Sequence, residues 1–444
     1  MKNRRKNRLS AILSVSYEES GGFMMFRRIR SAFERYIKES ATIINSEEFL
    51  DESKEKPEDF TRSRKLPFPK LILFMLTRVK GSTQNALEKY FEKLGEDIFM
   101  TQQAFSEARL KVKSSAFAML FYMTARIAYE GYYDTYWGYR VLAIDGSKIA
   151  LPDIWLLGEI YGKMGADASS PTAQASICYD VLNKVVVDAQ IEPLSIDERT
   201  LALRHIKNLD KSGRSDKDLA IMDRGYASFE LIEGLKNEKV SFLMRVKRGF
   251  NQDIDAQTSA DGTVILRKKG HRDIRVRVIK FALDSGETEV LITDIFNRNM
   301  GVRDFKKLYF LRWPVETKYD EVKNKLQIEN FTGISKKAIE QDFYATMYLA
   351  NIAAAARWDA QVRVVAERED KNNKYEYQVN VNHEIGVMKD RLIYALTLDN
   401  PADEIEKILR LLAKRVCPVK PGRSVVRNKS PRKSKFHWNS RANC

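Results

Sequence analysis

The sequence has few of the residues that build thiolate or imidazole metal sites. Among its 444 residues are three cysteines, Cys178, Cys417 and Cys444, whose positions fit neither a zinc-binding spacing nor a disulfide framework. The four histidines are scattered along the chain, so no zinc site is predicted. Cysteine usage of this kind is typical of a reducing compartment, and we expect a cytoplasmic location.

Long apolar runs are also missing. Hydrophobic residues make up 44% of the chain, a normal share for a water-soluble protein. No run approaches the roughly 18 apolar residues of a membrane-spanning helix. The basic start, Met1 to Leu9, is followed by Ser10 to Tyr17, which is too short and polar for the apolar core of a signal peptide. We therefore expect neither a membrane span nor a secretion signal.

Acidic residues are scarce relative to basic ones. The 76 lysines and arginines exceed the 60 acids, which leaves a net charge of +16. A basic excess of this size favours a polyanionic partner. The excess is local: the tail 423–435 contains no acid, and Arg245 to Arg248 forms a second basic run. Ribosomal and membrane-surface proteins share such a balance, so charge alone leaves the class open.

Two short apolar runs each end in an aspartate. Val141 to Ile144 precedes Asp145, and Leu219 to Met222 precedes Asp223. Short apolar runs are typical of buried strands, so we expect the first strand to end at Asp145. An aspartate just past such a strand avoids the cost of burying its charge. Either aspartate alone is more often a turn or capping residue, and the pair becomes a site only with further acids.

A third acid lies in a segment with unusual spacing. Tyr309, Arg312, Glu316 and Lys323 follow the pattern Y-x2-R-x3-E-x6-K. At about 100° per helical residue, these offsets point to roughly 0°, 300°, 340° and 320°, which is one narrow stripe. A phenol, a guanidinium, a carboxylate and an ammonium on one stripe fit a site that holds metal and binds phosphate beside it.

Pro314 interrupts this stripe. Proline lacks an N–H and disfavours helical geometry at the preceding residue. We therefore expect one helix to end near Leu311 and a second to begin at Pro314. The stripe then applies to Glu316 and Lys323, while Tyr309 and Arg312 would approach from the preceding segment.

Asp145, Asp223 and Glu316 form an all-oxygen donor set. Such a set suits Mg²⁺, or Mn²⁺, rather than zinc. Two such ions about 3.5–4 Å apart can activate a nucleophile and stabilise the leaving oxygen of a phosphodiester. The three acids are therefore predicted to be catalytic ligands of two metal ions.

The neighbouring basic residues are predicted to bind the nucleic-acid backbone. Arg312 and Lys323 would hold phosphates and align the strand, Tyr309 could donate to a phosphate oxygen, and Arg224 could neutralise substrate charge. Simpler alternatives are an ion pair of Arg312 or Lys323 with nearby acids and core packing of Tyr309. Trp313 is expected in the core.

With these motifs the chain resembles the DDE transposases of bacterial insertion sequences, in the group with the YREK signature (the insertion sequence four family). The resemblance covers roughly residues 60–440 and keeps the family's order. The stretches that carry it are Ala143-Ile144-Asp145-Gly146-Ser147, Met222-Asp223-Arg224-Gly225-Tyr226 and Tyr309 to Lys323, with support from Arg64-Lys65-Leu66-Pro67-Phe68 and Lys80-Gly81-Ser82.

The resemblance implies metal-dependent DNA cleavage at element ends and strand transfer. A metal-activated water would free a 3′-OH, which then attacks a second phosphodiester. In relatives the first target is the opposite strand, so hairpin ends are expected here. The implied partners are double-stranded DNA, as terminal inverted repeats and target, and a second copy of the chain in a synaptic homodimer.

Two alternatives stay open. A hydrolytic nuclease or junction resolvase could use the same carboxylates, and it would nick DNA without joining it. A catalytically inactive DNA-binding derivative of a transposase is a second alternative. The presence of all three acids argues against it.

The element pattern of residues 139–247 predicts an α/β core. The order is β-β-β-α-β-α-β, which the resemblance identifies with the ribonuclease H-like fold. In that fold the first and fourth strands end side by side, which would bring Asp145 and Asp223 together. After the strand at Asp145, the predicted elements are strands Thr172–Tyr179 and Lys184–Ile191, helix Ile196–Asp210, strand Leu219–Met222, helix Ser228–Asn237 and strand Val240–Val246.

The segments around this core are predicted from their own patterns. Apolar spacing from Pro69 to Glu130 indicates helices, one of them capped by Thr101. This helical region would bind DNA ends or only support the core; its basic residues are Lys70, Arg78, Lys80, Arg109, Lys111 and Lys113.

Residues 248–300 read as a β-rich insertion. The resemblance implies that it holds the transposon end, whereas the alternative is an exposed, charged sheet face. Its strand-like runs are Thr263–Arg267, Ile274–Val278 and Glu289–Thr293, and its basic residues are Arg267, Lys268, Lys269, Arg272, Arg275, Arg277 and Lys280.

The remaining segments complete the division of the chain. We expect a helix from Phe23 to Ile44, a linker from Asp51 to Glu58, and an alanine-rich helix from Lys336 to Arg357 that packs on the sheet. The predicted domains are a charged N-terminal segment (1–60), a helical DNA-binding or support domain (61–138), the first part of the core (139–247), the β-rich insertion (248–300), the glutamate and packing helices (301–365), and a C-terminal helical region with a basic tail (366–444).

Overall fold

The computed structural model describes residues 32–62, 64–77, 82–130, 133–165, 169–209, 217–283, 286–369, 371 and 373–420. These residues form two compact units. The sheet unit contains residues 133–148 and 174–320, and the helical unit contains residues 32–130, 149–173 and 321–420. The predictions that fall on Arg78, Lys80, Gly81, the tail 423–435 and the start of the Phe23 helix lie outside the described residues.

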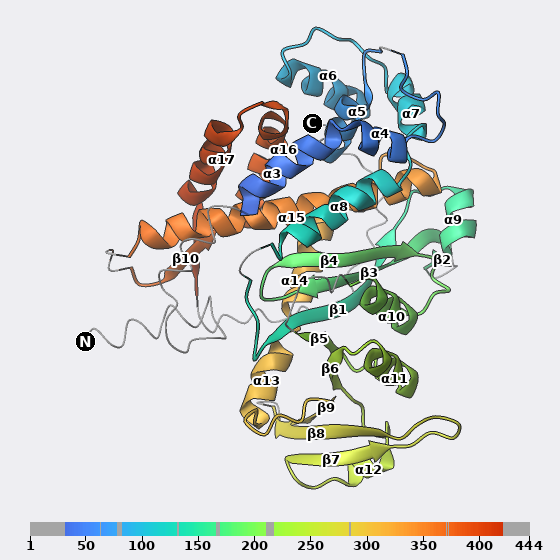
Figure 1. Ribbon diagram of the computed structural model, residues 1–444, viewed down its shortest axis with the longest axis vertical. Coiled ribbons are helices and arrows are strands. Elements are labelled where there is room, and N and C mark those ends of the chain that lie inside the picture. Colours follow the sequence, from blue (N-terminus) through green and yellow to red (C-terminus); the bar gives the residue numbers. More distant parts are fainter. Residues whose placement is uncertain are drawn as a thin grey trace. The chain divides into compact units, whose positions relative to one another are not determined.

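One mixed sheet is the core of the sheet unit (Figure 1). The strands β1, β5 and β6 run parallel to one another, and the side chains of Val141 to Ile144 and Leu219 to Met222 are fully buried. Continuous apolar runs of this kind are what strands covered on both faces require. The strand order is β4-β3-β1-β5-β6-β9-β8-β7, with β1 Tyr139–Ala150, β3 Ser170–Asp180, β4 Val185–Glu192, β5 Lys217–Met222, β6 Ser241–Arg245, β7 Asp261–Leu266, β8 Ile274–Ala282 and β9 Thr288–Thr293.

Helices connect these strands as the pattern predicted. Ser228 caps the helix between β5 and β6 by accepting a hydrogen bond from the Leu231 N–H, and Asp197 caps the helix between β4 and β5. The helices of this unit are α10 Glu198–Asn208, α11 Phe229–Asn237, α12 Gln252–Ala256, α13 Val302–Phe310 and α14 Pro314–Asp320.

The β-rich insertion continues the core sheet. Strands β7, β8 and β9 pair antiparallel in sequence, and β9 pairs antiparallel with β6. In Figure 1 the insertion therefore extends one end of the sheet. Its three strands were predicted from their alternation, but their joining to β6 depends on a pairing between distant residues.

The predicted end of the first strand at Asp145 is wrong. Strand β1 continues to Ala150, because β3 lies beside it on one edge. On the other edge the paired residues of β1 and β5 end at Ala143 and Ile221. Asp145 thus lies within β1, but beyond the last residue of β1 that pairs with β5.

The helical unit is built around the 31-residue helix α15. Ser335 caps this helix, and α15 packs against α3, α5, α8, α16 and α17 of its own unit. Its buried alanines allow close approach of these helices, and the packing of this alanine-rich segment on the sheet stays a prediction. The elements are α3 Ala32–Ile44, α4 Glu47–Ser53, α5 Phe68–Thr77, α6 Thr83–Lys93, α7 Gln102–Leu110, α8 Ser115–Ile127, α9 Trp155–Tyr161, β2 Lys163–Met164, the π-helix η1 Glu321–Lys325, α15 Lys336–Ala366, β10 Glu376–Val379, α16 Val381–Thr397, α17 Ala402–Lys414 and β11 Val416–Val419.

Two predictions for this unit are corrected. The segment from Asp51 to Glu58 begins as helix α4 rather than as a linker, because Ser46 caps α4 and the buried Phe49 anchors it. Arg109 was predicted to add to a DNA-binding charge, yet it is only 4% exposed. Its guanidinium donates to Asp342 Oδ1 at 2.9 Å, so it supports the core.

No helix within the described ranges is long and apolar enough to span a membrane.

Candidate active site

Asp145 and Asp223 lie at the same level of two neighbouring parallel strands. Each paired residue of β5 is numbered 78 higher than its partner on β1, as Ile221 is relative to Ala143. Asp223 is likewise numbered 78 higher than Asp145, so the same register places the two aspartates opposite each other. Adjacent strands are about 4.8 Å apart. Because Asp223 directly follows the last residue of β5, both carboxylates occur where the pairing of these strands has ended.

A tight turn holds the carboxylate of Asp223. The Gly225 N–H donates to Asp223 Oδ1 at 2.6 Å, and the Arg199 guanidinium donates to the Gly225 carbonyl at 3.1 and 3.2 Å. A Cβ atom at position 225 would lie 3.0 Å from that same Oδ1. Glycine therefore permits the close approach of the turn to the carboxylate.

The electrostatics of Asp145 join it to the other two acids. Burial raises its pKa to about 6, while Arg312 and the Gly146 N–H oppose this rise. The negative charges of Asp223 and Glu316 raise the same pKa further. The other two predicted carboxylates therefore both act on Asp145, and interactions of this kind perturb pKa values at functional sites.

Glu316 lies in the first turn of α14, as the proline predicted. Helix α13 ends with Leu311 as its C-cap, and α14 begins at Pro314. Arg312, in the turn between them, donates from Nη2 to Glu316 Oε1 at 2.8 Å. The simpler alternative for Arg312, an ion pair with a nearby acid, is thus present in the structure, and it occurs beside the other two carboxylates.

Tyr309 is half-buried near the same groups. Burial raises its pKa to about 12; Glu289 and Asp223 also raise it, whereas Arg312 and Arg245 lower it. Its hydroxyl is therefore protonated at neutral pH and can donate a hydrogen bond.

Two acidic residues that sequence reasoning missed, Glu289 and Glu198, add to this region. Glu289 on β9 is 4% exposed and pairs with Arg245 at 2.8 Å. Burial raises the pKa of Glu289, while Arg245, Arg224 and Arg312 lower it. Three guanidinium groups therefore act electrostatically on one carboxylate. Arg245 belonged to a visible basic run, but nothing in the sequence marked Glu289.

Glu198 is a further acid near Asp145. It accepts from Gln174 Nε2 at 3.3 Å, and a Cβ atom at Gly146 would lie 2.8 Å from its Oε1. Glycine at position 146 thus lets the side chains of Gln174 and Glu198 lie over the strand directly after Asp145. No spacing in the sequence marked Glu198, because it is the first residue of helix α10.

The three acids offer carboxylate oxygens, the donor atoms that divalent cations such as Mg²⁺ prefer. Across the part of the chain that the structure describes, no three carboxylate, imidazole or thiolate side chains are gathered closely enough to hold a metal ion as they stand. Burial raises the pKa of Tyr226 well above its usual value, as do Glu198, Asp145 and Asp223. Its buried hydroxyl has no hydrogen-bond partner among the described residues. An unsatisfied buried donor beside like-charged carboxylates is typical of a site completed by a ligand.

Lys323 lies on the π-helix η1, directly after α14 in the chain. It belongs to the helical unit, where its Nζ lies 3.9 Å from Glu329 Oε1. Burial lowers its pKa, and Glu329 opposes that change. Its predicted role in phosphate binding stays a prediction.

Trp313 is not a core residue as predicted. Its side chain is 53% exposed, and that of Phe310 is 55% exposed. The turn between α13 and α14 needs only Arg312 and Val315 to face inward, so the aromatic side chains beside them face solvent.

Several basic residues of the insertion face inward, contrary to prediction. Arg277 is buried, and its guanidinium donates to Asp261 and to the Met300 carbonyl. Lys280 donates to the Ile254 carbonyl at 2.8 Å. These two side chains fasten the insertion internally. Arg275 is exposed and lies 4.6 Å from the Phe296 ring.

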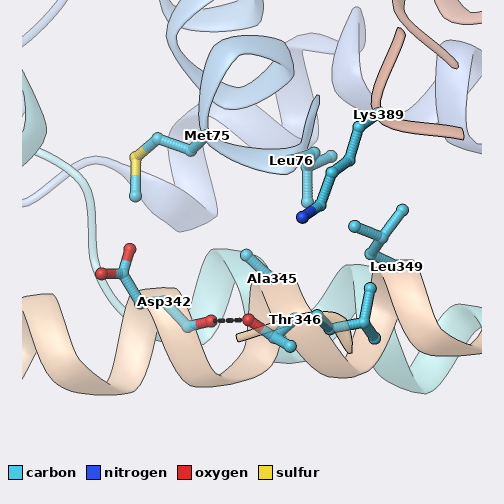
Figure 2. Close-up of a pocket in the computed structure, with 8 residues that line it drawn as sticks. Met75, Leu76, Asp342, Ala345, Thr346, Leu349 and Lys389 are labelled. Atoms are coloured by element: carbon cyan, nitrogen blue, oxygen red, sulfur yellow. Dashed lines mark hydrogen bonds between the residues drawn. The ribbon is translucent and has the colours of Figure 1, made fainter. Parts of the chain in front are cut away.

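A small pocket in the helical unit holds none of the predicted site residues (Figure 2). Thr346 Oγ1 donates to the Asp342 carbonyl at 2.7 Å along its floor, and the Asp342 carboxylate is bound by Arg109. The pocket is lined by Met75, Leu76, Leu326, Asp342, Ala345, Thr346, Leu349 and Lys389.

Comparison with known proteins found a matching family model, a sequence relative and a solved structure. Residues 136–352, which include all three acids, match the family model of the transposase DDE domain. The transposase InsG for insertion sequence element IS4 of Escherichia coli (strain K12) is 23% identical over 316 residues, which are 66% of this chain and 70% of the relative. A cryo-EM structure of a piggyBac transposase synaptic complex with hairpin DNA covers 87% of both chains, with a TM-score of 0.44 and 10% identity.

Proposed function

We propose that Asp145, Asp223 and Glu316 are the catalytic carboxylates of this chain, which belongs to the DDE transposases of the insertion sequence four type. The enzyme cleaves DNA and transfers strands during transposition. One observation carries the assignment of residues: Asp145 and Asp223 share a level on neighbouring strands, and the charge of Glu316 acts on Asp145.

The strand order supports a ribonuclease H-like core. When the short β2 is set aside, the order β4-β3-β1-β5-β6 places the first strand in the middle and the fourth beside it. The antiparallel pairing of β3 with β4 and the parallel pairing of β1, β5 and β6 agree with that fold.

DDE transposases use divalent metal, and we assign two Mg²⁺ or Mn²⁺ ions to the three acids. When bound, such ions activate the attacking oxygen and stabilise the leaving oxygen of a phosphodiester. The residues supply negative oxygen ligands: burial raises the pKa of Asp145, and repulsion from Asp223 and Glu316 raises it further. Arg312 offsets part of that repulsion by its bond to Glu316.

The basic groups around the acids position the DNA backbone. Arg312, Arg224 and Arg245 act on the same carboxylate, Glu289, and so form a region of positive charge next to the acids. Guanidinium groups bind phosphate oxygens with fixed geometry. Tyr309 adds a neutral hydroxyl donor, and Lys323 is assigned to a further phosphate.

Exposed side chains on nearby elements extend this DNA surface. Trp313, beside Arg312, can stack on a base, because aromatic faces bind unpaired bases irrespective of sequence. Lys269, Arg272 and Arg275 of the insertion are exposed and are assigned to backbone contacts of the element end. Residues 61–138 would support the core or bind the same DNA.

The chemistry proceeds in two phosphoryl transfers. Water attacks the phosphodiester at the element end and releases a 3′-OH, which then attacks a second phosphodiester in line. The hairpin route, in which the opposite strand is the first target, is assigned here by family resemblance. Two ends joined to one target require a synaptic homodimer, acting on terminal inverted repeats and target DNA in the bacterial cytoplasm.

A cleavage and joining assay tests the assignment. Labelled DNA with the element's terminal inverted repeats is incubated with protein and Mg²⁺. We expect the isosteric variant Asp223→Asn to lose at least about a thousandfold in cleavage rate while it still binds DNA. Asp273→Asn, at an exposed acid of the same unit, is the control. Cleavage by Asp223→Asn at the normal rate would refute the site, and nicks without joined products would favour a hydrolytic nuclease.

A further inference from the structure

The main-chain carbonyl of Asp145 accepts hydrogen bonds from two side chains. Tyr319 Oη donates to it at 2.9 Å, and Ser176 Oγ donates to it at 3.3 Å. Tyr319 Oη also lies 3.3 Å from the Ala175 carbonyl. The backbone of the strand that carries Asp145 is thus held from two directions.

One of these donors comes from the helix that carries Glu316. Tyr319 lies three residues after Glu316 on α14 and is 7% exposed. Residues three apart on a helix lie on neighbouring positions of one face. The Tyr319 hydroxyl has one proton to donate, and the 2.9 Å bond directs it to the Asp145 carbonyl. A bond from Tyr319 to Asp145 therefore links two acids that are distant in the chain.

The other donor belongs to a buried polar cluster. His205 Nε2 lies 2.8 Å from Ser176 Oγ, and His205 Nδ1 lies 2.5 Å from Asp188 Oδ2. These three residues have the order of a hydrolytic triad, but each is at most 1% exposed. No substrate reaches such a serine, and the cluster instead fixes Ser176 against the Asp145 backbone. The Tyr319 bond thus ties α14 to a strand that is already fixed on the Ser176 side.

We propose that Tyr319 is a positioning residue that sets the separation of Asp145 and Glu316, and thereby the affinity of the acid set for divalent metal. The inference rests on the proposed function, since it takes these acids as metal ligands. Tyr319 itself touches neither metal nor DNA. Groups that orient metal ligands typically affect metal affinity by about 10–100-fold when removed.

The test compares two tyrosines that each lose one buried hydroxyl. Tyr319→Phe removes the bond to Asp145, whereas Tyr348→Phe removes a bond of 2.7 Å to Ser40 in the helical unit. Mn²⁺ binding to the full chain is measured by electron paramagnetic resonance, and thermal unfolding of the metal-free protein is followed in parallel. We expect both variants to unfold at slightly lower temperature, and only Tyr319→Phe to bind Mn²⁺ roughly tenfold more weakly.

A third variant separates this inference from the proposed function. If Asp145→Asn loses Mn²⁺ binding but Tyr319→Phe binds as the unchanged protein does, the acids are ligands and the positioning role of Tyr319 is wrong. Equal losses of Mn²⁺ affinity in Tyr319→Phe and Tyr348→Phe would also overturn it. If Asp145→Asn binds Mn²⁺ normally, the proposed metal site fails, and the inference about Tyr319 fails with it.

Discussion

Arg312 Nη2 donates a hydrogen bond of 2.8 Å to Glu316 Oε1, across the break between α13 and α14. The arginine is largely buried, so its charge acts on its surroundings with little screening. Its positive charge also lowers the pKa values of Asp145 and Glu289. The positive charge of Arg312 thus offsets part of the negative charge of three carboxylates in the DNA-free protein.

Replacement of Arg312 tests this balance. We expect Arg312→Gln to reduce DNA cleavage about a hundredfold, because a positioned donor to the transferring group is lost. The pKa of Asp145 should rise further, so the acid limb of the rate profile should move to higher pH. Arg303→Gln, at an exposed arginine of α13, is the control and should leave both unchanged. An unaltered pH profile in Arg312→Gln would contradict the electrostatic role.

The raised pKa of Asp145 predicts a pH-dependent effect on stability. In the unfolded chain this carboxyl titrates near its usual value of 3.8, whereas in the folded metal-free protein its pKa is about 6. Its ionisation therefore opposes folding: the cost is absent below about pH 4, grows between the two values, and is complete above pH 6. Asp145→Asn should stabilise the metal-free protein by roughly 3 kcal/mol at pH 8 and by almost nothing at pH 4.

Urea unfolding of both proteins across this pH range measures the difference. Asp273→Asn serves as the control, since that acid is exposed. Equal stability of Asp145→Asn and the unchanged protein at pH 8 would show that ionisation of Asp145 does not destabilise the folded protein.

Gly225 is predicted to matter for activity more than for stability. An added Cβ would meet Asp223 Oδ1 at 3.0 Å and displace the carboxylate by a few tenths of an ångström. We expect Gly225→Ala to lower cleavage about tenfold, since misplacement of a reacting group by 1 Å costs about a hundredfold. The free energy of unfolding should change by less than about 1 kcal/mol. Gly386→Ala is the matched control, because a Cβ there would meet nothing within 4 Å.

Arg109 is predicted to act through stability alone. Arg109→Ala would leave Asp342 as a buried carboxylate without its guanidinium, and we expect a loss of about 3–5 kcal/mol in the free energy of unfolding. Lys111→Ala, at a more exposed ion pair 3.8 Å long, should lose less than about 1 kcal/mol. A change in DNA affinity of folded Arg109→Ala, without a change in unfolding, would restore the DNA-binding role that the sequence suggested.

In contrast to Arg109, Trp313 is predicted to affect DNA binding and to contribute little to stability. Because its side chain is half exposed, Trp313→Ala should leave thermal unfolding nearly unchanged. Loss of one stacked base should weaken binding of element-end DNA by about 1–3 kcal/mol. Trp155→Ala, at a tryptophan 72% exposed in the helical unit, is the control. Equal DNA affinity in both variants would show that Trp313 does not stack on the substrate.

Local chemistry determined what the sequence could predict. The alternation of β7 to β9, the apolar runs of β1 and β5, and the break at Pro314 depend on neighbouring residues, and each occurs where expected. The family motifs also predicted the three acids as the site, a prediction that the strand register of Asp145 and Asp223 supports. In contrast, the ends of elements that depend on a partner strand were misjudged, as at Asp145.

Tertiary structure alone decided what surrounds those acids. The shared level of Asp145 and Asp223 follows from strand register. The proposed role of Tyr319 follows from its contact with Asp145, more than a hundred residues away in the chain. The environment of Glu289 follows from its burial and from the charges of distant arginines. The same holds for Arg109, which is buried, and Trp313, which is exposed. Periodicity shows how a side chain is oriented within its own element, but burial and charge balance depend on which distant surfaces meet it.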